Sequence, residues 1–265
     1  MRKIFFAVLL LIAFGVNAQW ISTNLPYQGY SNKIDFYNVN SGISCGYSAL
    51  THEGKIFYTA NSGLNWNLST FPPELRNITD IQYISSSVVY ASGEENIIPA
   101  LQKETDYTYK RIFLKSTNSG ISWDRVIPFD TMSGKFDNIH FFNQNTGYAI
   151  ENVNRTILPT FYKTTNGGLN WIQISTLDVD FVIQDMEFLN ENIGFLVGYV
   201  CCGINAMIFK TVNGGLTWKS FNYRLTDDFT GINFFNATTG IVVGRCTTYY
   251  NGTKIYRTQD AGESW

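Results

Sequence analysis

The sequence is poor in charge, histidine and cysteine, and each shortage excludes a class of function. Only 15% of its 265 residues are charged and the formal net charge is −2, so we predict no binding to nucleic acid or to an anionic membrane. The chain has two histidines, four cysteines and no Cys-x-x-Cys pair, which argues against a metal site. Phosphate-binding loops and nucleophile motifs are absent. We therefore predict no catalytic residue, cofactor or metal.

Long apolar runs are also lacking, with one exception at the N-terminus. A basic start and an apolar stretch lead to a small-residue cleavage site, so residues 1–18 are typical of a signal peptide and the mature chain is predicted to begin at Gln19. The apolar stretch is short for a membrane span, and an uncleaved anchor is the alternative. We expect a secreted, cell-surface or periplasmic protein without a membrane span after cleavage.

Tryptophan, in contrast, recurs at a nearly constant spacing. The six tryptophans are separated by 46, 57, 48, 47 and 47 residues, and they are Trp20, Trp66, Trp123, Trp171, Trp218 and Trp265. The segments that end at the last five read YTANSGLNW, KSTNSGISW, KTTNGGLNW, KTVNGGLTW and RTQDAGESW. They share the pattern [S/T]-x-[N/D]-x-G-x-[S/T/N]-W. Self-similarity at this period is typical of a solenoid, a propeller or an array.

A second signature precedes each tryptophan at the same period, for example IHFFNQNTG from Ile139 and INFFNATTG from Ile232. Apolar and polar residues alternate in it, which is the pattern of a strand. A second apolar run, a third strand and a fourth strand at the tryptophan follow. Four short strands in about 47 residues are typical of one propeller blade. We predict an all-β propeller of four-stranded antiparallel blades, with five repeats visible over residues 19–265.

The tryptophan-containing hairpin has a mechanical interpretation. Its Asn or Asp is expected to accept hydrogen bonds from amides of its own turn, and its Gly to adopt a positive φ. The tryptophan is expected to begin the outer strand and to pack between neighbouring sheets. We predict a structural role for these residues, which are Asn61, Gly63, Trp66, Asn118, Gly120, Trp123, Asn166, Gly168, Trp171, Asn213, Gly215, Trp218, Asp260, Gly262 and Trp265.

These hairpins resemble the Asp-box, or BNR, repeats of sialidase-type propellers. The paired F-x-N-x-x-x-G and T-x-N-G-G-x-T-W pattern is most similar to the propellers of photosystem II stability and assembly factors and their secreted bacterial relatives. Most copies carry Asn in place of the Asp that names the box, and Asn can fill the same turn. The resemblance implies a propeller fold over residues 20–265. It does not imply one function, because hydrolases, receptors and assembly factors share the box.

The last repeat stops at Trp265, where a further strand is expected. Residues 20–23 resemble the segment that follows Trp66 and could supply that strand, but Trp20 and Trp265 would then compete for one place. We therefore expect an incomplete ring that belongs to a longer protein. A five-blade ring is the alternative.

The cysteines are compatible with one disulfide bond in an exported protein. Cys201 and Cys202 follow the second strand of the fourth repeat, and Cys246 follows that of the fifth. We predict that Cys202 pairs with Cys246, with Cys201 as the other candidate. Cys45 lies within its strand and is predicted to be a buried free thiol.

One repeat carries an insertion from Gly93 to Arg111. Its acidic start, Glu94 and Glu95, and the tyrosines Tyr107 and Tyr109 could contact a ligand. A tolerated, solvated loop is the favoured alternative.

Hydrolysis by a sialidase-like mechanism would need clustered arginines, a Tyr paired with a Glu, and an acid. The arginine motif at Arg125 follows a box tryptophan, where it is expected to lie on an outer strand away from the channel. Candidate carboxylates near the channel are Asp80, Asp137, Asp178, Asp180, Asp185, Asp227 and Asp228. Asp80 and Asp185 share one repeat position, so we interpret them as turn caps rather than catalytic groups.

From these residues we interpret the chain as a secreted or cell-surface binding or scaffold module for a protein or glycan ligand, not as an enzyme. The alternative is a glycoside hydrolase of sialidase-like type with catalytic residues partly outside this chain.

Overall fold

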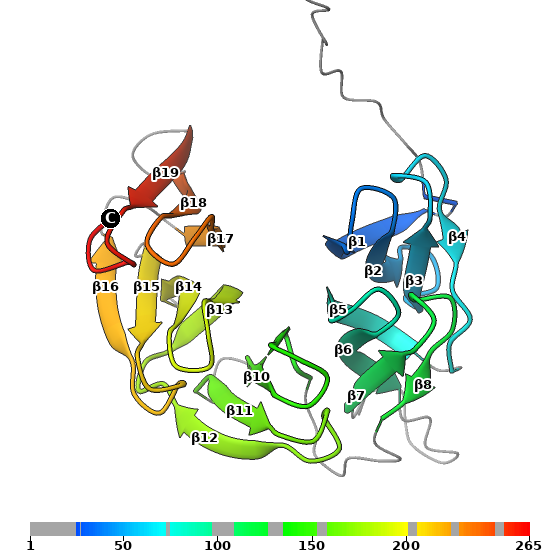
Figure 1. The fold of residues 1–265 in the computed structure, drawn as a ribbon, viewed down its shortest axis with the longest axis horizontal. Coiled ribbons are helices and arrows are strands. Elements are labelled where there is room, and N and C mark those ends of the chain that lie inside the picture. The colour runs from blue at the N-terminus through cyan, green and yellow to red at the C-terminus, as the bar shows by residue number, and fades with distance from the viewer. Residues whose placement is uncertain are drawn as a thin grey trace, which may run out of the picture.

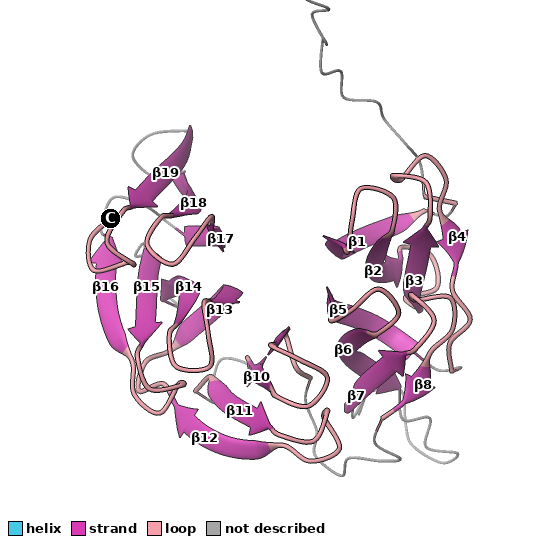
Figure 2. Cartoon of the chain, in the orientation of Figure 1, coloured by secondary structure: helices cyan, strands magenta, loops and turns pink. Residues whose placement is uncertain are grey.

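The computed structural model describes residues 25–26, 28–72, 75–96, 109–126, 135–152, 158–200, 206–223, 228–246 and 252–265. All the regular elements in these ranges are β-strands, as Figure 2 shows. Within them, no helix is found that could cross a bilayer.

The strands form five antiparallel sheets, which we call blades 1 to 5. Blade 1 is β1 (Gly29–Phe36), β2 (Gly42–Ser48), β3 (Gly54–Thr59) and β4 (Asn67–Leu68). Blade 2 is β5 (Leu75–Tyr83), β6 (Val89–Asn96), β7 (Tyr109–Ser116) and β8 (Asp124–Arg125). Blade 3 is β9 (Asn138–Phe141), β10 (Gly147–Glu151), β11 (Thr160–Thr164) and β12 (Ile172–Thr176).

Blade 4 is β13 (Phe181–Phe188), β14 (Gly194–Val200), β15 (Ala206–Thr211) and β16 (Lys219–Tyr223). Blade 5 has three strands, β17 (Asp228–Phe234), β18 (Gly240–Cys246) and β19 (Gly252–Thr258). Strand order follows chain order in every blade, so each blade is a simple meander.

The blades stand side by side around a central channel, with their first strands innermost and their fourth strands outermost (Figure 1). The ring is open between blade 5 and blade 1 (Figure 1). The molecule is therefore a five-bladed β-propeller, which confirms the predicted fold class. Blade 5 has three strands in the described residues, and residues 20–23, which could supply a fourth, lie outside them.

The apolar core lies between blades rather than within them. Four clusters of buried residues occupy the four interfaces, and each draws on both neighbouring blades. In the first cluster, for example, Ile43 and Ile56 of blade 1 meet Ile78 and Ile81 of blade 2. One tryptophan belongs to each cluster, and these are Trp123, Trp171, Trp218 and Trp265. A blade is thus stabilised mainly by its neighbours, as in other repeat proteins.

The box hairpin is held by three hydrogen bonds, seen here in blade 3. The Thr164 hydroxyl donates to Asn166 Oδ1 at 3.0 Å, and its oxygen accepts the Gly168 amide at 2.9 Å. Asn166 Oδ1 also accepts the Asn170 amide at 2.9 Å. The same three bonds recur in the other four blades. In blade 5 the hydroxyl and amide of Ser264 hold the pKa of Asp260 well below its usual range.

The box turn contains two successive residues with positive φ, where the sequence predicted one. The box glycines have φ between 75° and 85°. The preceding residues also lie in the left-handed region, at φ of 57° to 70°, and they are Ser62, Ser119, Gly167, Gly214 and Ala261. Blades 3 and 4 place glycine at both positions, which removes the steric cost.

The two sequence signatures share one phase because the turns that they encode touch. In blade 3 the amide of Gly167, in the box, donates to the carbonyl of Asn145 in the turn between the first two strands, at 2.8 Å. Blade 4 has the equivalent bond from Gly214 to Asn192, at 2.9 Å. The asparagine of the first turn caps its own loop, since Asn143 Oδ1 accepts the Thr146 amide at 2.9 Å. Each repeat therefore fixes both turns at one edge of its sheet.

Two boundaries differ from the sequence prediction. The fourth strands begin one residue after the tryptophan, as at Asn67 and Ile172. The second and third strands of blade 2 also extend into the predicted insertion, so Glu94 and Glu95 belong to β6. Glu94 lies 3.8 Å from Arg76, and Glu95 pairs with Arg125. Both carboxylates thus form ion pairs within blade 2. Tyr107 lies outside the described residues.

Candidate functional site

The channel contains a cavity of about 790 Å³ that is built by a repeated irregularity of the inner strands. A β-bulge interrupts the pairing of the first strand in blades 1, 2, 4 and 5. The residues skipped there are Asn32, Thr79, Gln184 and Thr230, and all four line the cavity. A bulge re-aims a side chain, which explains how four blades present polar groups to one space.

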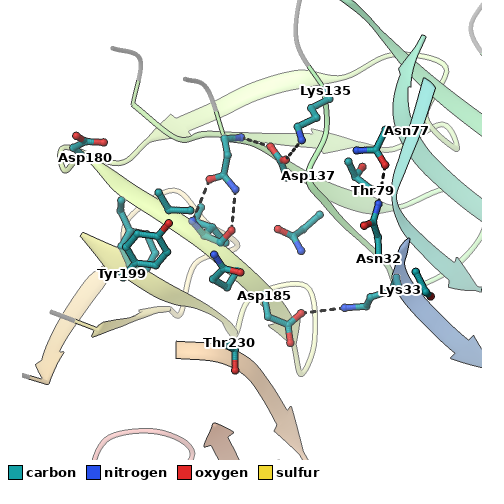
Figure 3. Close-up of a pocket in the computed structure, with 17 residues that line it drawn as sticks. Asn32, Lys33, Asn77, Thr79, Lys135, Asp137, Asp180, Asp185, Tyr199 and Thr230 are labelled. Carbon is teal, nitrogen blue, oxygen red and sulfur yellow. Dashed lines mark hydrogen bonds and ion pairs between the residues drawn. The ribbon is translucent and has the colours of Figure 1, made fainter. Parts of the chain in front are cut away.

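Blade 3 contributes to the same cavity through the residues before β9. Asp137 precedes the first residue of β9, and Lys135 binds it at 3.1 Å (Figure 3). Asp137 Oδ2 also accepts the amide of Asn152 at 2.8 Å. Burial raises the pKa of Asp137, although Lys135 and the Asn152 amide oppose that rise.

Amide side chains tie neighbouring blades together around the cavity. Asn32 Nδ2 of blade 1 donates to Asn77 Oδ1 of blade 2 at 2.7 Å (Figure 3). Asn152 of blade 3 makes a paired contact with the backbone of Ile183 in blade 4, donating to its carbonyl at 2.9 Å and accepting its amide at 3.2 Å. Hydrogen bonds between blades 1 and 2 and between blades 3 and 4 therefore hold the edge of the cavity. Asp180 and Tyr199 of blade 4 line the cavity beside these contacts (Figure 3).

An ion pair crosses the channel. Lys33 Nζ of blade 1 lies 3.2 Å from Asp185 Oδ1 of blade 4 (Figure 3). Burial opposes the charge on Lys33, but the carboxylates of Asp80 and Asp185 outweigh it and raise the pKa of this amine. Lys33 occupies the repeat position of Asp80 and Asp185, so the charge is reversed there in blade 1. This reversal is the sequence signal that could have revealed the ion pair, and it becomes visible only when the inner strands are aligned by register.

A second cavity of about 410 Å³ shares Lys33 and Asp185 with the first. It is lined by the next polar position of each inner strand, and these residues are Asp35, Gln82, His140, Glu187 and Asn233. The ion pair thus belongs to both cavities.

The inner carboxylates bind the backbone of the following blade, and Asp80 and Asp185 also accept the amide of the residue that follows them, at 2.8 Å from Ile81 and 3.0 Å from Met186. Asp80 Oδ2 accepts the amide of Ile139 at 2.8 Å, and Asp185 Oδ2 accepts that of Ile232 at 3.1 Å. Asp35 Oδ2 accepts the Tyr83 amide at 2.7 Å in the same way. The prediction that Asp80 and Asp185 cap a local turn was therefore incomplete, because each accepts one amide of its own strand and one amide of the next blade. The inner strand is a sheet edge, and these carboxylates satisfy amides that the sheet leaves unpaired.

Burial also shifts the pKa of three further groups in the channel. It raises the pKa of Asp80 to about 6, against the opposing effects of Lys33 and two backbone amides. It raises the pKa of Glu187 to about 7, with a further contribution from Asp185. Burial, followed by the charge of Lys33, lowers the pKa of His140 to about 4.

The remaining predicted carboxylates are dispersed. Asp180 lines the larger cavity, whereas Asp178 does not. Asp228 is buried and binds Arg245 at 2.8 Å. Asp227 lies outside the described residues. The structure therefore brings together only part of the predicted set.

The pattern residues of the tryptophan-containing hairpins and the cysteines lie elsewhere. None of the described residues that line the larger cavity belongs to these hairpin patterns. Cys45 is buried and free. Cys246 ends β18, while Cys201 and Cys202 lie outside the described residues, so the disulfide stays a prediction.

A tyrosine–glutamate–arginine cluster, which no motif in the sequence indicates, lies between blades 2 and 3. Glu151 Oε2 accepts bonds from Arg111 at 2.5 Å and from the Tyr162 hydroxyl at 3.0 Å. The guanidinium group lies 4.0 Å from the centre of the Phe136 ring. The exposed fractions of Arg111, Glu151 and Tyr162 are 5%, 6% and 9%, and none lines the channel cavity. A Tyr–Glu pair is thus present, but it is buried within blade 3, where Arg111 of blade 2 binds its glutamate.

Comparison with known proteins finds solved structures of similar fold but assigns no family to the sequence. No protein-family model matches the sequence, and no curated protein matches it. Among solved structures, YCF48 bound to D1 peptide is 14% identical, with a TM-score of 0.51 over 92% of this chain and 83% of that one. YCF48 from Cyanidioschyzon merolae is 16% identical, with a TM-score of 0.54 over 91% of this chain and 69% of that one.

A GH74 enzyme from Niastella koreensis is 14% identical, with a TM-score of 0.61 over 89% of this chain and 37% of the enzyme. The likeness shows the fold alone. The propeller is thus shared with both peptide-bound and hydrolytic proteins, and function has to be argued from the site.

Proposed function

We propose that this chain is an exported binding module whose channel cavity holds a polar segment of a protein ligand. The observation that carries the proposal is the ring of bulged polar residues, Asn32, Thr79, Gln184 and Thr230, with Asp137 at the corresponding place in blade 3. These residues occupy equivalent positions in the five repeats and line one cavity, so all five blades contribute to the site.

The chemistry of the lining favours polypeptide over a small apolar ligand. Sites for small molecules are lined mainly by apolar and aromatic side chains. Here amide, hydroxyl and charged groups predominate, and Phe181 and Tyr199 are the aromatic residues among the described lining. Amide side chains match the donors and acceptors of an extended backbone. The lysines and aspartates would select a segment that carries charges of both signs.

The fold comparison is compatible with this proposal. The YCF48 structure with a D1 peptide is a propeller of the same general fold, so this architecture can present a surface for a peptide. Export is supported by the signal-like residues 1–18.

Glycoside hydrolysis fits the channel less well. It requires an acid and a second carboxylate on opposite sides of one bond. In the described channel, Asp35, Asp80 and Asp185 hold backbone amides of the next blade, so their removal would disturb the ring itself. A panel of glycoside substrates belongs in the experiment for this reason.

The test is a peptide-library screen with the secreted chain, followed by affinity measurements on the peptides recovered. We expect Tyr199→Ala and Asp180→Asn to weaken binding at least tenfold, the loss that about 1.4 kcal/mol produces. Glu53→Gln, at an exposed site on the outer loop of blade 1, is the matched control and should bind like the wild type. The proposal would be overturned if neither cavity substitution weakened peptide binding, or if the chain hydrolysed a glycoside.

A further inference from the structure

One face of each blade projects side chains into the next blade, and these positions are buried in blades 1 to 4. The second residue of the second strand is at most 1% exposed there, as Ile43, Tyr90, Tyr148 and Phe195. The third-strand residue that pairs with the fourth residue of the second strand is at most 3% exposed, as Ile56, Phe113, Phe161 and Ile208. We call this the projecting face.

Blade 5 has the same face, and no other blade covers it among the residues that the structure describes. Its Ile241 is only half-buried, although it corresponds in register to Ile43 and Phe195. Its Ile255 is 68% exposed, although the corresponding Ile208 in blade 4 is fully buried. Asn233 is also exposed, at the position where Asp35 and Gln82 bind amides of the next blade.

The opposite face of each blade receives those side chains, and in blade 1 it is open. Ile34 is 54% exposed and Phe36 is 41% exposed. In blade 3 the corresponding Ile139 and Phe141 are 5% and 4% exposed. We call this the receiving face.

The box glycines show what the receiving face is shaped to accept. A Cβ atom at Gly120, Gly168, Gly215 or Gly262 would overlap an apolar side chain of the preceding blade, namely Ile43, Phe113, Phe161 or Phe195. At Gly63 of blade 1, the nearest atoms belong to its own Trp66 and Phe36, at 3.6 to 3.8 Å. Each of the five blades thus has a recess beside its box glycine. In blade 1, no side chain of a preceding blade fills this recess.

We propose that the projecting face of blade 5 docks onto the receiving face of blade 1 of a second copy of this chain. The two faces carry the same residue types that pack at the four internal interfaces, and they lie on either side of the gap in the ring (Figure 1). Because each copy offers one face of each kind, the contact is head-to-tail. Such a contact closes into a ring or continues as a filament. Exposed apolar patches of this type mark association surfaces.

The experiment measures the mass of the secreted chain by light scattering over a concentration series. The wild type is expected to form dimers or larger species as concentration rises. Ile34→Asp disables the receiving face and Ile255→Asp the projecting face, and both residues are exposed enough for the fold to survive. Each variant alone should be monomeric. Ile172→Asp, at a 66% exposed position on the outer strand β12, is the matched control and should associate like the wild type.

Mixing the two variants gives the decisive result. Each Ile34→Asp copy keeps its projecting face and each Ile255→Asp copy keeps its receiving face, so the mixture should form one-to-one dimers and nothing larger. Circular dichroism and thermal melting establish that both variants are folded; Ile34→Thr and Ile255→Thr serve if either aspartate variant is not. A wild type that stays monomeric, including one whose ring closes on itself, overturns the proposal. So does a mixture that stays monomeric.

Discussion

At the residue scale, the channel carboxylates act as backbone ligands. Asp35, Asp80 and Asp185 each accept an amide from the inner strand of the next blade, and they recur because every inner strand leaves such amides unpaired. The sequence showed the recurrence but not the partner. Repeat position alone cannot distinguish a cap on a local turn from a cap on the inner strand of the next repeat.

Glu187 should make stability depend on pH. Its pKa is raised to about 7 in the fold, so the stability it contributes is fully present below about pH 4 and is lost as the pH rises through about 7. Glu187→Gln removes this titration, and we expect the variant to be more stable than the wild type at pH 8 by at most about 3 kcal/mol. Urea denaturation at pH 4 and pH 8 measures the difference. His140 titrates in the opposite sense in both proteins, so an equal pH dependence in the two would contradict this assignment.

A pair of glycine substitutions separates backbone strain from packing between blades. Gly63 and Gly168 have φ of 81° and 85°, so alanine costs about 1–2 kcal/mol of strain at either position. Only at Gly168 would the new methyl group also meet Phe113, which adds about 1–3 kcal/mol for overpacking. We expect Gly168→Ala to have the lower urea midpoint, with the difference in free energy of unfolding as the measured quantity. Equal losses would mean that the recess does not differ between the two blades.

At the element scale, the repeat made the fold predictable. Strand order, blade number and both turns follow from two signatures in one phase, because each turn is held by side chains of its own repeat. The cavity was less accessible, since the bulges at Asn32 and Thr79 depend on how the inner strands pair and leave no mark in the hydrophobic pattern. The Arg111–Glu151 contact was hidden for a similar reason, because its partners come from different repeats.

The contribution of each tryptophan to stability should depend on whether a neighbouring blade packs against its ring. Trp171 lies between blades 2 and 3, with its ring 4.8 Å from that of Phe136 and 5.5 Å from that of Phe113. Trp66 packs on Phe36 of its own blade at 6.1 Å, on the open receiving face. We expect Trp171→Ala to lose about 3–5 kcal/mol of unfolding free energy, and Trp66→Ala clearly less.

Chemical denaturation measures both losses, and peptide binding of the folded fraction shows whether the site is spared. A Trp171→Ala protein that kept full stability but lost binding would contradict the structural role of the box.

At the scale of the whole molecule, five sheets that depend on their neighbours for stability form one channel. Each blade buries its apolar residues against a neighbour, so the inner strands are held in a common frame and their bulges meet at one cavity. The ion pair from Lys33 to Asp185 joins blade 1 to blade 4 across that channel. The proposed peptide site and the two open faces are therefore carried by different residues of the propeller.

Amide hydrogen exchange with and without a bound library peptide is the decisive measurement for the binding channel, because it locates the ligand on the chain. We predict slower exchange in the inner strands around the cavity, over β1, β5 and β13, with the outer strands β4, β8 and β12 unchanged. Protection confined to the outer strands or to the open faces of blades 1 and 5 would show that the peptide binds elsewhere and that the channel is not its site.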